Sequence, residues 1–239
     1  MVKAQLNLQR LLRLPIVSSV YGLRLAANWN DATFRFYVEG SYGFFLSDLL
    51  RDRSQPFCFI DIGANQGLYS ILAARNPYCC AVLALEPVPG TAHLLRRNLA
   101  INAADQKVAV IEAALSDQTG RAIIKLPMNH SGGATLRQKH TGGELESVEI
   151  ELIDCQALNS WRCDPNAPII AKVDVEGQEP TVIQELMKSS HAESIRAIFY
   201  ECDEAWFDPA EIETLLRQSG FRTFDRIGAG SHYDVLASR

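Results

Sequence analysis

FIDIGANQGLYSI, at residues 59–71, places an apolar strand, an aspartate and two glycines directly before the start of a helix. This order presents backbone N–H groups and the positive end of a helix to a ligand. Dinucleotide-binding folds use G-x-G-x-x-G here, so that a pyrophosphate can approach the middle glycine closely. Gly63 and Gly67 are present, but Asn65 occupies the middle position. The turn is therefore poorly suited to a pyrophosphate.

Asp61, at the end of the strand, would repel a phosphate and suits a cationic ligand. S-adenosylmethionine (SAM) has no phosphate, and its tail carries an ammonium and a carboxylate beside a sulfonium. We expect Asp61 to receive the ammonium and the amides of the turn to receive the carboxylate. Glu86 ends the next strand, nineteen residues after Gly67. A carboxylate there can accept hydrogen bonds from both ribose hydroxyls.

The adenine is expected near the end of the third strand, around 112–114. The predicted cofactor residues are Asp61, Gly63, Asn65, Gly67, Glu86, Ala114 and Asp117, the last lying just beyond the third strand. Two other interpretations stay open. The glycines and acids can form an ordinary strand end in water, or the chain can be an NAD(P)-dependent oxidoreductase of the Rossmann type.

Apolar runs alternate with helical patterns from Phe57 onward, which predicts an α/β fold with a parallel sheet and helices on both faces. Strands are expected at 56–61, 81–86, 108–113, 167–177 and 195–201, with a terminal antiparallel pair at 221–227 and 232–238. Helices are expected to begin near 68 and to span 88–100, 179–189 and 209–219. A β insertion follows the third strand at 120–153, with strands at 121–126 and 147–153. Residues 1–50 are expected to be an extension, with a helical start and then a strand-like segment, packed on a domain at 51–239.

Several motifs together resemble the FkbM family of SAM-dependent methyltransferases. They are FIDIGANQGLYSILAA, LALEPVPGTAHLLRRNLAIN, EAALSDQTG, GGATL, AKVDVEGQE and IFYE, and they span roughly residues 57–201 in order. The resemblance implies a class I methyltransferase fold, a Rossmann-like sheet of seven strands whose last strand inserts antiparallel. It also implies O-methylation of a hydroxyl on a sugar, glycoconjugate or natural product.

The stretch KVDVEG ends another strand, which places Asp174 and Glu176 at the edge where open α/β sheets bind ligands. An alcohol is a poor nucleophile, so a base can take its proton during methyl transfer. Asp174 is predicted as that base, with Glu176 orienting the acceptor. Alternatively, Asp174, Glu176 and Glu201 hold a divalent cation such as Mg²⁺. A third possibility is that His130 is the base, on a lid formed by Asn129–Thr135 and Gln138–Thr141.

The formal net charge of −5 argues against nucleic acid as an electrostatic partner. The resemblance implies a small-molecule or glycan acceptor. Six cysteines without a CxxC pair favour a reducing, cytoplasmic compartment. The charged residues before Asp31 are all basic: Lys3, Arg10, Arg13 and Arg24. They indicate either a helix that contacts a membrane surface or one packed on the domain with its cations in water. A non-catalytic SAM-binding scaffold also stays open, and the sequence does not predict an oligomeric state.

Overall fold

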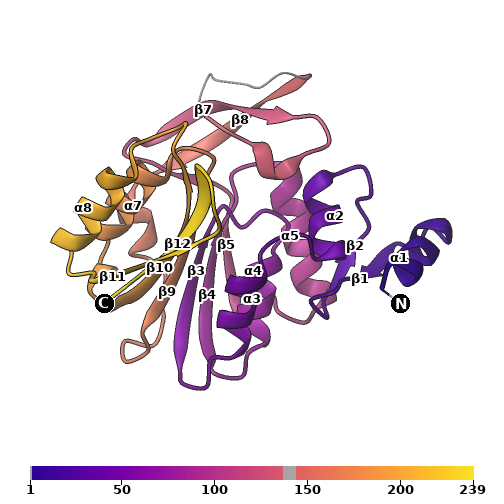
Figure 1. Cartoon of the computed structure of the whole chain (residues 1–239), viewed down its shortest axis with the longest axis horizontal. Helices are drawn as coiled ribbons and strands as arrows, with labels where there is room; N and C mark the ends of the chain where they lie inside the picture. Colours follow the sequence, from indigo (N-terminus) through magenta and orange to yellow (C-terminus); the bar gives the residue numbers. More distant parts are fainter. Residues whose placement is uncertain (1, 137–143) are drawn as a thin grey trace.

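The computed structural model describes residues 2–136 and 144–239, and a seven-stranded sheet forms its centre (Figure 1). The strands follow the order β11-β12-β10-β9-β3-β4-β5. β12 runs antiparallel to both neighbours, whereas β3 pairs in parallel with β4 and β9. The predicted class I sheet is therefore confirmed. Its strands are β3 (Phe57–Ile62), β4 (Cys79–Leu85), β5 (Val108–Ile111), β9 (Ile169–Val173), β10 (Ile195–Asp203), β11 (Thr223–Ile227) and β12 (His232–Ser238).

Helices cover both faces of this sheet, as predicted. Residues alternate along β3: Phe57 and Phe59 join a core with helices of one face, and Cys58 and Ile60 join a second core on the other. Burial on both faces explains why β3 is a continuous apolar run. The first face carries α3 (Phe44–Arg51), α4 (Leu68–Arg75) and α5 (Pro89–Ile101). The second carries α6 (Cys155–Leu158), α7 (Glu179–Lys188) and α8 (Pro209–Gln218), with η2 (Ala192–Ser194) leading into β10.

The insertion after the third strand forms a small sheet of its own, in the order β6-β8-β7. Its elements are β6 (Ala114–Leu115), β7 (Gly120–Pro127), η1 (Ser131–Gly133) and β8 (Leu145–Ile153). β7 and β8 pair antiparallel across their whole length and lie over one end of the central sheet (Figure 1). Of the predicted lid, Asn129–Thr135 lies within the described residues and Gln138–Thr141 lies outside them.

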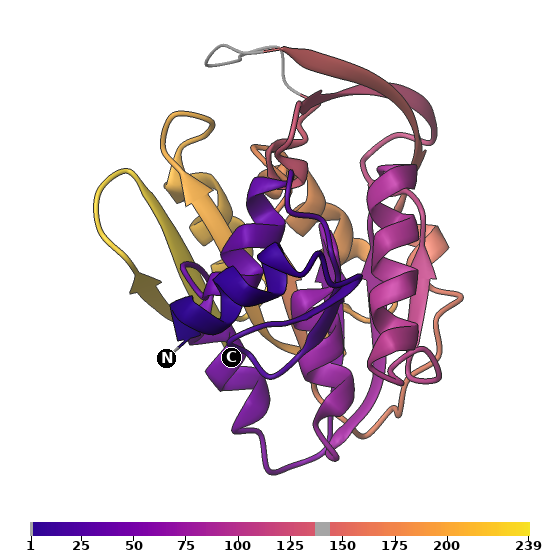
Figure 2. The ribbon, with the colours of Figure 1, turned by 90° about the vertical axis from the view of Figure 1, so that its right-hand side faces the viewer.

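The first fifty residues contain more structure than the sequence indicated. α1 (Val2–Leu11) is followed by a hairpin of β1 (Ile16–Ser18) and β2 (Arg24–Ala26), and then by α2 (Ala32–Glu39) and α3. The sequence analysis did not resolve α2 and α3, and the boundary drawn at 50/51 falls within the last turn of α3. Val17, Leu25 and Phe34 share a core with Phe59. These residues are therefore part of the domain core, and Figure 2 shows α1 and α2 on the same side of the molecule.

Within the residues that the structure describes, no helix has the length and apolar character required to cross a bilayer.

Candidate active site

A pocket opens beyond the carboxyl ends of β3, β4, β9 and β10, beneath the insertion. This is the edge at which open parallel sheets bind ligands. Four segments form its lining: the strand ends, the N-terminal residues 33–42, the insertion loop at 130–136, and the start of β12. Among the predicted residues, the lining includes Gly63, Asn65, Glu86, Ala114, His130, Asp174, Glu176 and Glu201. The pocket thus brings together predicted cofactor residues and predicted catalytic residues.

Glu86 is held in place by the backbone around it. Its Oε2 accepts a hydrogen bond from the Asn65 amide at 2.9 Å, and its Oε1 accepts one from the Val88 amide at 3.0 Å. Each oxygen keeps a further lone pair for a hydroxyl donor. Burial raises the pKa of Glu86 to about 7, although the two amides act in the opposite direction. The side chain is therefore an oriented acceptor at the end of β4.

The glycine turn is shaped by close packing beneath the pocket. Gly63 has a φ of 77°, and a Cβ there would collide with the backbone oxygen of Asp174. Asn65 has a φ of 49°, a left-handed conformation that asparagine tolerates better than most residues. Its side-chain oxygen accepts from the Gln66 amide at 2.9 Å. The turn therefore needs glycine at 63 but not at 65, in agreement with the sequence.

Three predicted cofactor residues, Asp61, Gly67 and Asp117, do not line the pocket. Asp61 is fully buried, and its Oδ2 accepts from Ser70 Oγ at 2.6 Å. It therefore faces α4 and Lys172, and is not positioned to receive an ammonium. Gly67 is the N-cap of α4, where a Cβ would lie 2.5 Å from Leu95 Cδ1, so it serves helix packing. Asp117 is exposed beyond β6.

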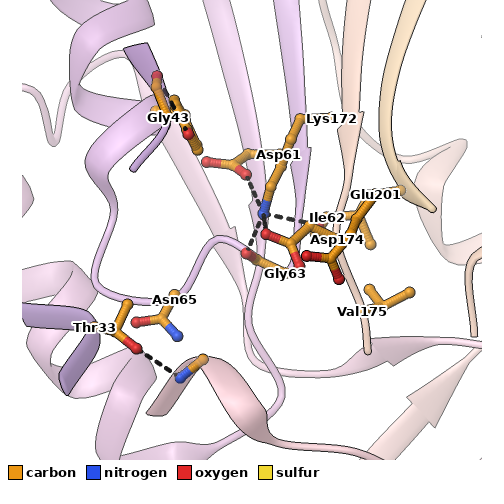
Figure 3. Close-up of polar contacts among 12 residues, drawn as sticks. Thr33, Gly43, Asp61, Ile62, Gly63, Asn65, Lys172, Asp174, Val175 and Glu201 are labelled. Carbon is orange, nitrogen blue, oxygen red and sulfur yellow. Dashed lines mark hydrogen bonds and ion pairs between the residues drawn. The ribbon is translucent and has the colours of Figure 1, made fainter. Parts of the chain in front are cut away.

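Lys172 lies at the centre of a buried charge cluster beneath the pocket (Figure 3). Its Nζ donates to the Gly63 carbonyl at 2.6 Å and lies 3.6 Å from Asp61 Oδ1 and 3.4 Å from Asp174 Oδ2. Asp61 and Lys172 are direct register partners in β3 and β9. Burial by itself would lower the pKa of Lys172, but Asp174 and Asp61 raise it. The Lys172 ammonium thus links the glycine turn, at Gly63, to Asp174, the predicted base.

Asp174, Glu176 and Glu201 converge in the pocket. One carboxylate oxygen from each lies within 4.8 Å of the others. Burial raises the pKa of Glu176 to about 9, with Glu201 and Asp174 contributing. The raised pKa favours the protonated form of Glu176. Its φ of 53° is a strained conformation of the kind found at functional sites.

The turn that carries Glu176 is fixed by its neighbours. The Glu179 carboxylate accepts from the Val175 amide at 2.9 Å and from the Gly177 amide at 2.9 Å. Thr135 Oγ1 donates to the Glu176 carbonyl at 2.7 Å, which ties the insertion to the same turn. The turn that carries Glu176 is thus held by both α7 and the insertion.

This set of oxygens is compatible with a hard divalent cation, because Mg²⁺ and Ca²⁺ prefer carboxylate ligands. Two cations already lie beside it, however. Lys172 is next to Asp174, and His232 Nε2 lies 2.8 Å from Glu201 Oε1. The hydrogen bond to Glu201 raises the pKa of His232 to about 9, so the imidazolium partly neutralises the cluster.

His130 also reaches the pocket, from the insertion loop. Its ring packs edge-on against Phe36, with the ring centroids 6.2 Å apart. This position keeps His130 available as the alternative base.

Several lining residues were not found by sequence reasoning. Thr33, Phe36, Tyr37 and Tyr42 come from the N-terminal segment, and His232 comes from β12. Burial raises the pKa of Tyr37 well above its ordinary value, so its hydroxyl stays a donor. No local motif marks these residues, because long-range packing brings them to the pocket. The one available signal was the apolar pattern of α2, with Asp31 as its N-cap.

A family model described as "Methyltransferase FkbM domain" matches residues 61–223. The curated relatives include Methyltransferase sdnD of Sordaria araneosa, 30% identical over 200 residues that cover 73% of this chain and 76% of that protein. Methyltransferase 1 of Beauveria bassiana (strain ARSEF 2860) is 25% identical over 179 residues, covering 68% of this chain and 71% of its own length.

Solved structures share the fold at low sequence identity. The complex of aTrm5 with tRNALeu has a TM-score of 0.50 at 14% identity and covers 93% of this chain and 51% of that one. Precorrin-6y C5,15-methyltransferase from Geobacter metallireducens GS-15 has a TM-score of 0.48 at 14% identity and covers 82% and 87%.

Proposed function

The chain belongs to the FkbM methyltransferase family, and on that premise we propose that it transfers a methyl group from SAM to a hydroxyl of a sugar, glycoconjugate or other natural product. One observation supports this most directly. A single pocket has an oriented carboxylate, Glu86, suited to a ribose and a carboxylate, Asp174, suited to a proton transfer. The acidic net charge also favours a small acceptor over a nucleic acid.

The cofactor side of the pocket fits a nucleoside. Glu86 offers acceptor oxygens for two hydroxyls, while Leu85, Ala114 and Leu115 supply an apolar surface for a base. Bound SAM would supply a methyl group carried on a sulfonium. The amides of residues 63–67 already donate within the protein, so the turn does not offer them to the carboxylate of SAM as the sequence suggested. Asn65 in the middle position also prevents close approach of a phosphate, which disfavours a dinucleotide.

The other side of the pocket provides for the acceptor's proton. Asp174 would accept the proton of the acceptor hydroxyl, while Lys172 holds its carboxylate in place. Glu176, with its raised pKa, would donate a hydrogen bond to the acceptor. His130 stays the alternative base, because it lines the same pocket.

A divalent cation held by Asp174, Glu176 and Glu201 is the second way to activate the hydroxyl. A chelator assay on the wild type separates these routes. Loss of turnover with EDTA that is restored by Mg²⁺ would establish the metal route, and unchanged turnover would establish the metal-free one.

The cofactor class is tested by calorimetric titration of the purified protein with S-adenosylhomocysteine (SAH) and with NADH. We expect SAH to bind and NADH not to bind. Tight binding of NADH alone would identify an oxidoreductase instead.

Activity is tested with labelled SAM and a panel of sugars and hydroxylated natural products. Transfer of label to a hydroxyl is the expected result. SAH binding without any transfer across a broad panel would favour the non-catalytic scaffold.

A further inference from the structure

Asp31 joins three segments that are far apart in the sequence. As the N-cap of α2, its Oδ1 accepts from the Phe34 amide at 2.8 Å. The same oxygen accepts from Gln66 Nε2 at 2.9 Å, on the glycine turn. Its Oδ2 accepts from the Ser131 amide at 2.7 Å, in the insertion loop. The Asp31 side chain is buried, and its bonds to Phe34 and Gln66 are buried with it, while the bond to Ser131 is partly buried.

Further contacts reinforce this connection between the loop and the N-terminal segment. The Gly132 amide donates to Thr33 Oγ1 at 2.9 Å, a contact that Figure 3 draws beside Asn65. The Ala32 amide donates to the Asn129 carbonyl at 2.8 Å. A Cβ at Gly132 would lie 2.8 Å from Thr33 Oγ1, so the two backbones approach closely. Residues 129–132 are therefore fastened to residues 31–33.

The fastened loop is also part of the cofactor pocket. Ser131 and its neighbours His130 and Gly132 line it. Ser131 Oγ lies 3.0 Å from Asn65 Oδ1, and the Asn65 amide donates to Glu86. A continuous set of hydrogen bonds thus leads from Asp31 to the predicted ribose acceptor. The loop therefore forms one side of the pocket.

We propose that Asp31 is a positioning residue that holds loop 129–132 closed against the glycine turn and thereby retains the cofactor. The inference rests on the proposed function for the identity of the ligand only. Asp31 does not line the pocket and acts through Ser131 and Gln66.

Asp31→Ser separates this role from helix capping. Serine caps a helix about as well as aspartate, so α2 keeps its N-cap, but the second oxygen and the charge are lost. We expect SAH to dissociate roughly 10- to 100-fold faster, as for loss of hydrogen bonds to a charged group. The Ser131 and Gly132 amides should exchange hydrogen faster, while amides of α2 and the thermal midpoint stay close to wild type.

Asp208→Ser is the matched control. Asp208 is the N-cap of α8, where it accepts from the Ala210 amide at 3.0 Å, and it does not line the pocket. This variant should leave SAH dissociation unchanged. Thr33→Val provides a second test that leaves the cap of α2 intact, because it removes the hydroxyl that accepts from the Gly132 amide. Thr33 also lines the pocket, so exchange of the loop amides in the ligand-free protein is the decisive readout for this variant. It should also speed SAH release and loop exchange.

Wild-type SAH dissociation in both Asp31→Ser and Thr33→Val would overturn the proposal. The exchange measurement on the ligand-free protein keeps this result distinct from a failure of the proposed function. If the wild type binds no SAH, both the proposed function and the role of Asp31 in retaining the cofactor are refuted. Hydrogen exchange of the loop amides then still decides whether Asp31 holds the loop in place.

Discussion

The pocket has one wall made from the ends of β3, β4 and β9, and another made from residues 33–42 together with the loop at 130–136. The first wall is fixed by sheet register and by a buried ammonium, Lys172. The second is fixed by hydrogen bonds between segments about a hundred residues apart, centred on Asp31. On the proposed function, the first wall would support the chemistry and the second would control access to it.

The largest effect should come from breaking the charge cluster of the first wall. Lys172→Met leaves the fully buried Asp61 without its cation. Breaking a buried ion pair by removing one partner costs about 3–5 kcal/mol, so the free energy of unfolding should fall by that order. Urea denaturation measures it. Arg121→Met, which removes an exposed guanidinium whose partner Glu149 is also exposed, should leave the midpoint nearly unchanged. A wild-type midpoint for Lys172→Met would show that Lys172 is not structural.

Asp174→Asn tests the chemistry of the same wall. The amide keeps the shape of the side chain but cannot take a proton, so turnover should fall by roughly 100-fold or more. SAH affinity, measured by calorimetry, should stay near wild type, because Glu86 and the turn at 63–67 are unchanged. Asp225→Asn, at an exposed position of β11, is the matched control and should be fully active. Near-normal turnover of Asp174→Asn would exclude both the base and the metal-ligand role.

The two walls also differ in how well the sequence predicted them. Glu86 and Asp174 were found because the ends of neighbouring parallel strands meet at one edge, and the edge is fixed by strand order alone. Thr33, Tyr42 and His232 were missed because their positions depend on packing between distant segments. The residues adjacent to them in the sequence do not indicate that packing.

Asp61 shows a different limit. It was correctly placed at the end of β3, but its side chain points to the face that carries Phe57 and Phe59, toward α4. Strand alternation could have indicated this direction, with Ser70 and Lys172 as polar partners in apolar surroundings. Strand position alone was therefore insufficient to assign a ligand contact.

The pH dependence of cofactor binding tests Glu86 in the first wall. Burial raises its pKa to about 7, and only the ionised carboxylate offers both oxygens to hydroxyl donors. SAH affinity should therefore rise with pH, by roughly 10-fold between one unit below and one unit above that pKa. Titrations across this range measure it. Glu86→Gln should bind more weakly and lose the slope, and Glu151→Gln should keep it. The same slope in Glu86→Gln would assign the titration to another group.

The smallest effect on turnover is expected at the outer face of the N-terminal segment. Leu6 and Gln9 of α1 are buried, whereas Leu8, Leu11 and Leu12 are 53%, 79% and 59% exposed. The exposed leucines share one helix face, at i, i+3 and i+4.

Arg10 and Arg13 lie next to these leucines, and no carboxylate occurs before Asp31. Pairing of this face with a second copy would bring like charges together. An anionic bilayer supplies both an apolar interior and the opposite charge. We therefore expect the protein to sediment with vesicles containing about one third phosphatidylglycerol and not with pure phosphatidylcholine.

Leu11→Ser/Leu12→Ser should abolish vesicle binding, and Arg10→Gln/Arg13→Gln should weaken it by roughly 5-fold for each charge removed. Ile123→Ser, at an exposed position of β7, is the matched control and should bind like wild type. Turnover of a soluble acceptor should be the same in all of these variants, because the leucines do not line the pocket. A wild type that stays in the supernatant, or a dimer that Leu11→Ser/Leu12→Ser dissociates, would refute membrane contact. Either result would leave the N-terminal segment with its inner, pocket-forming role alone.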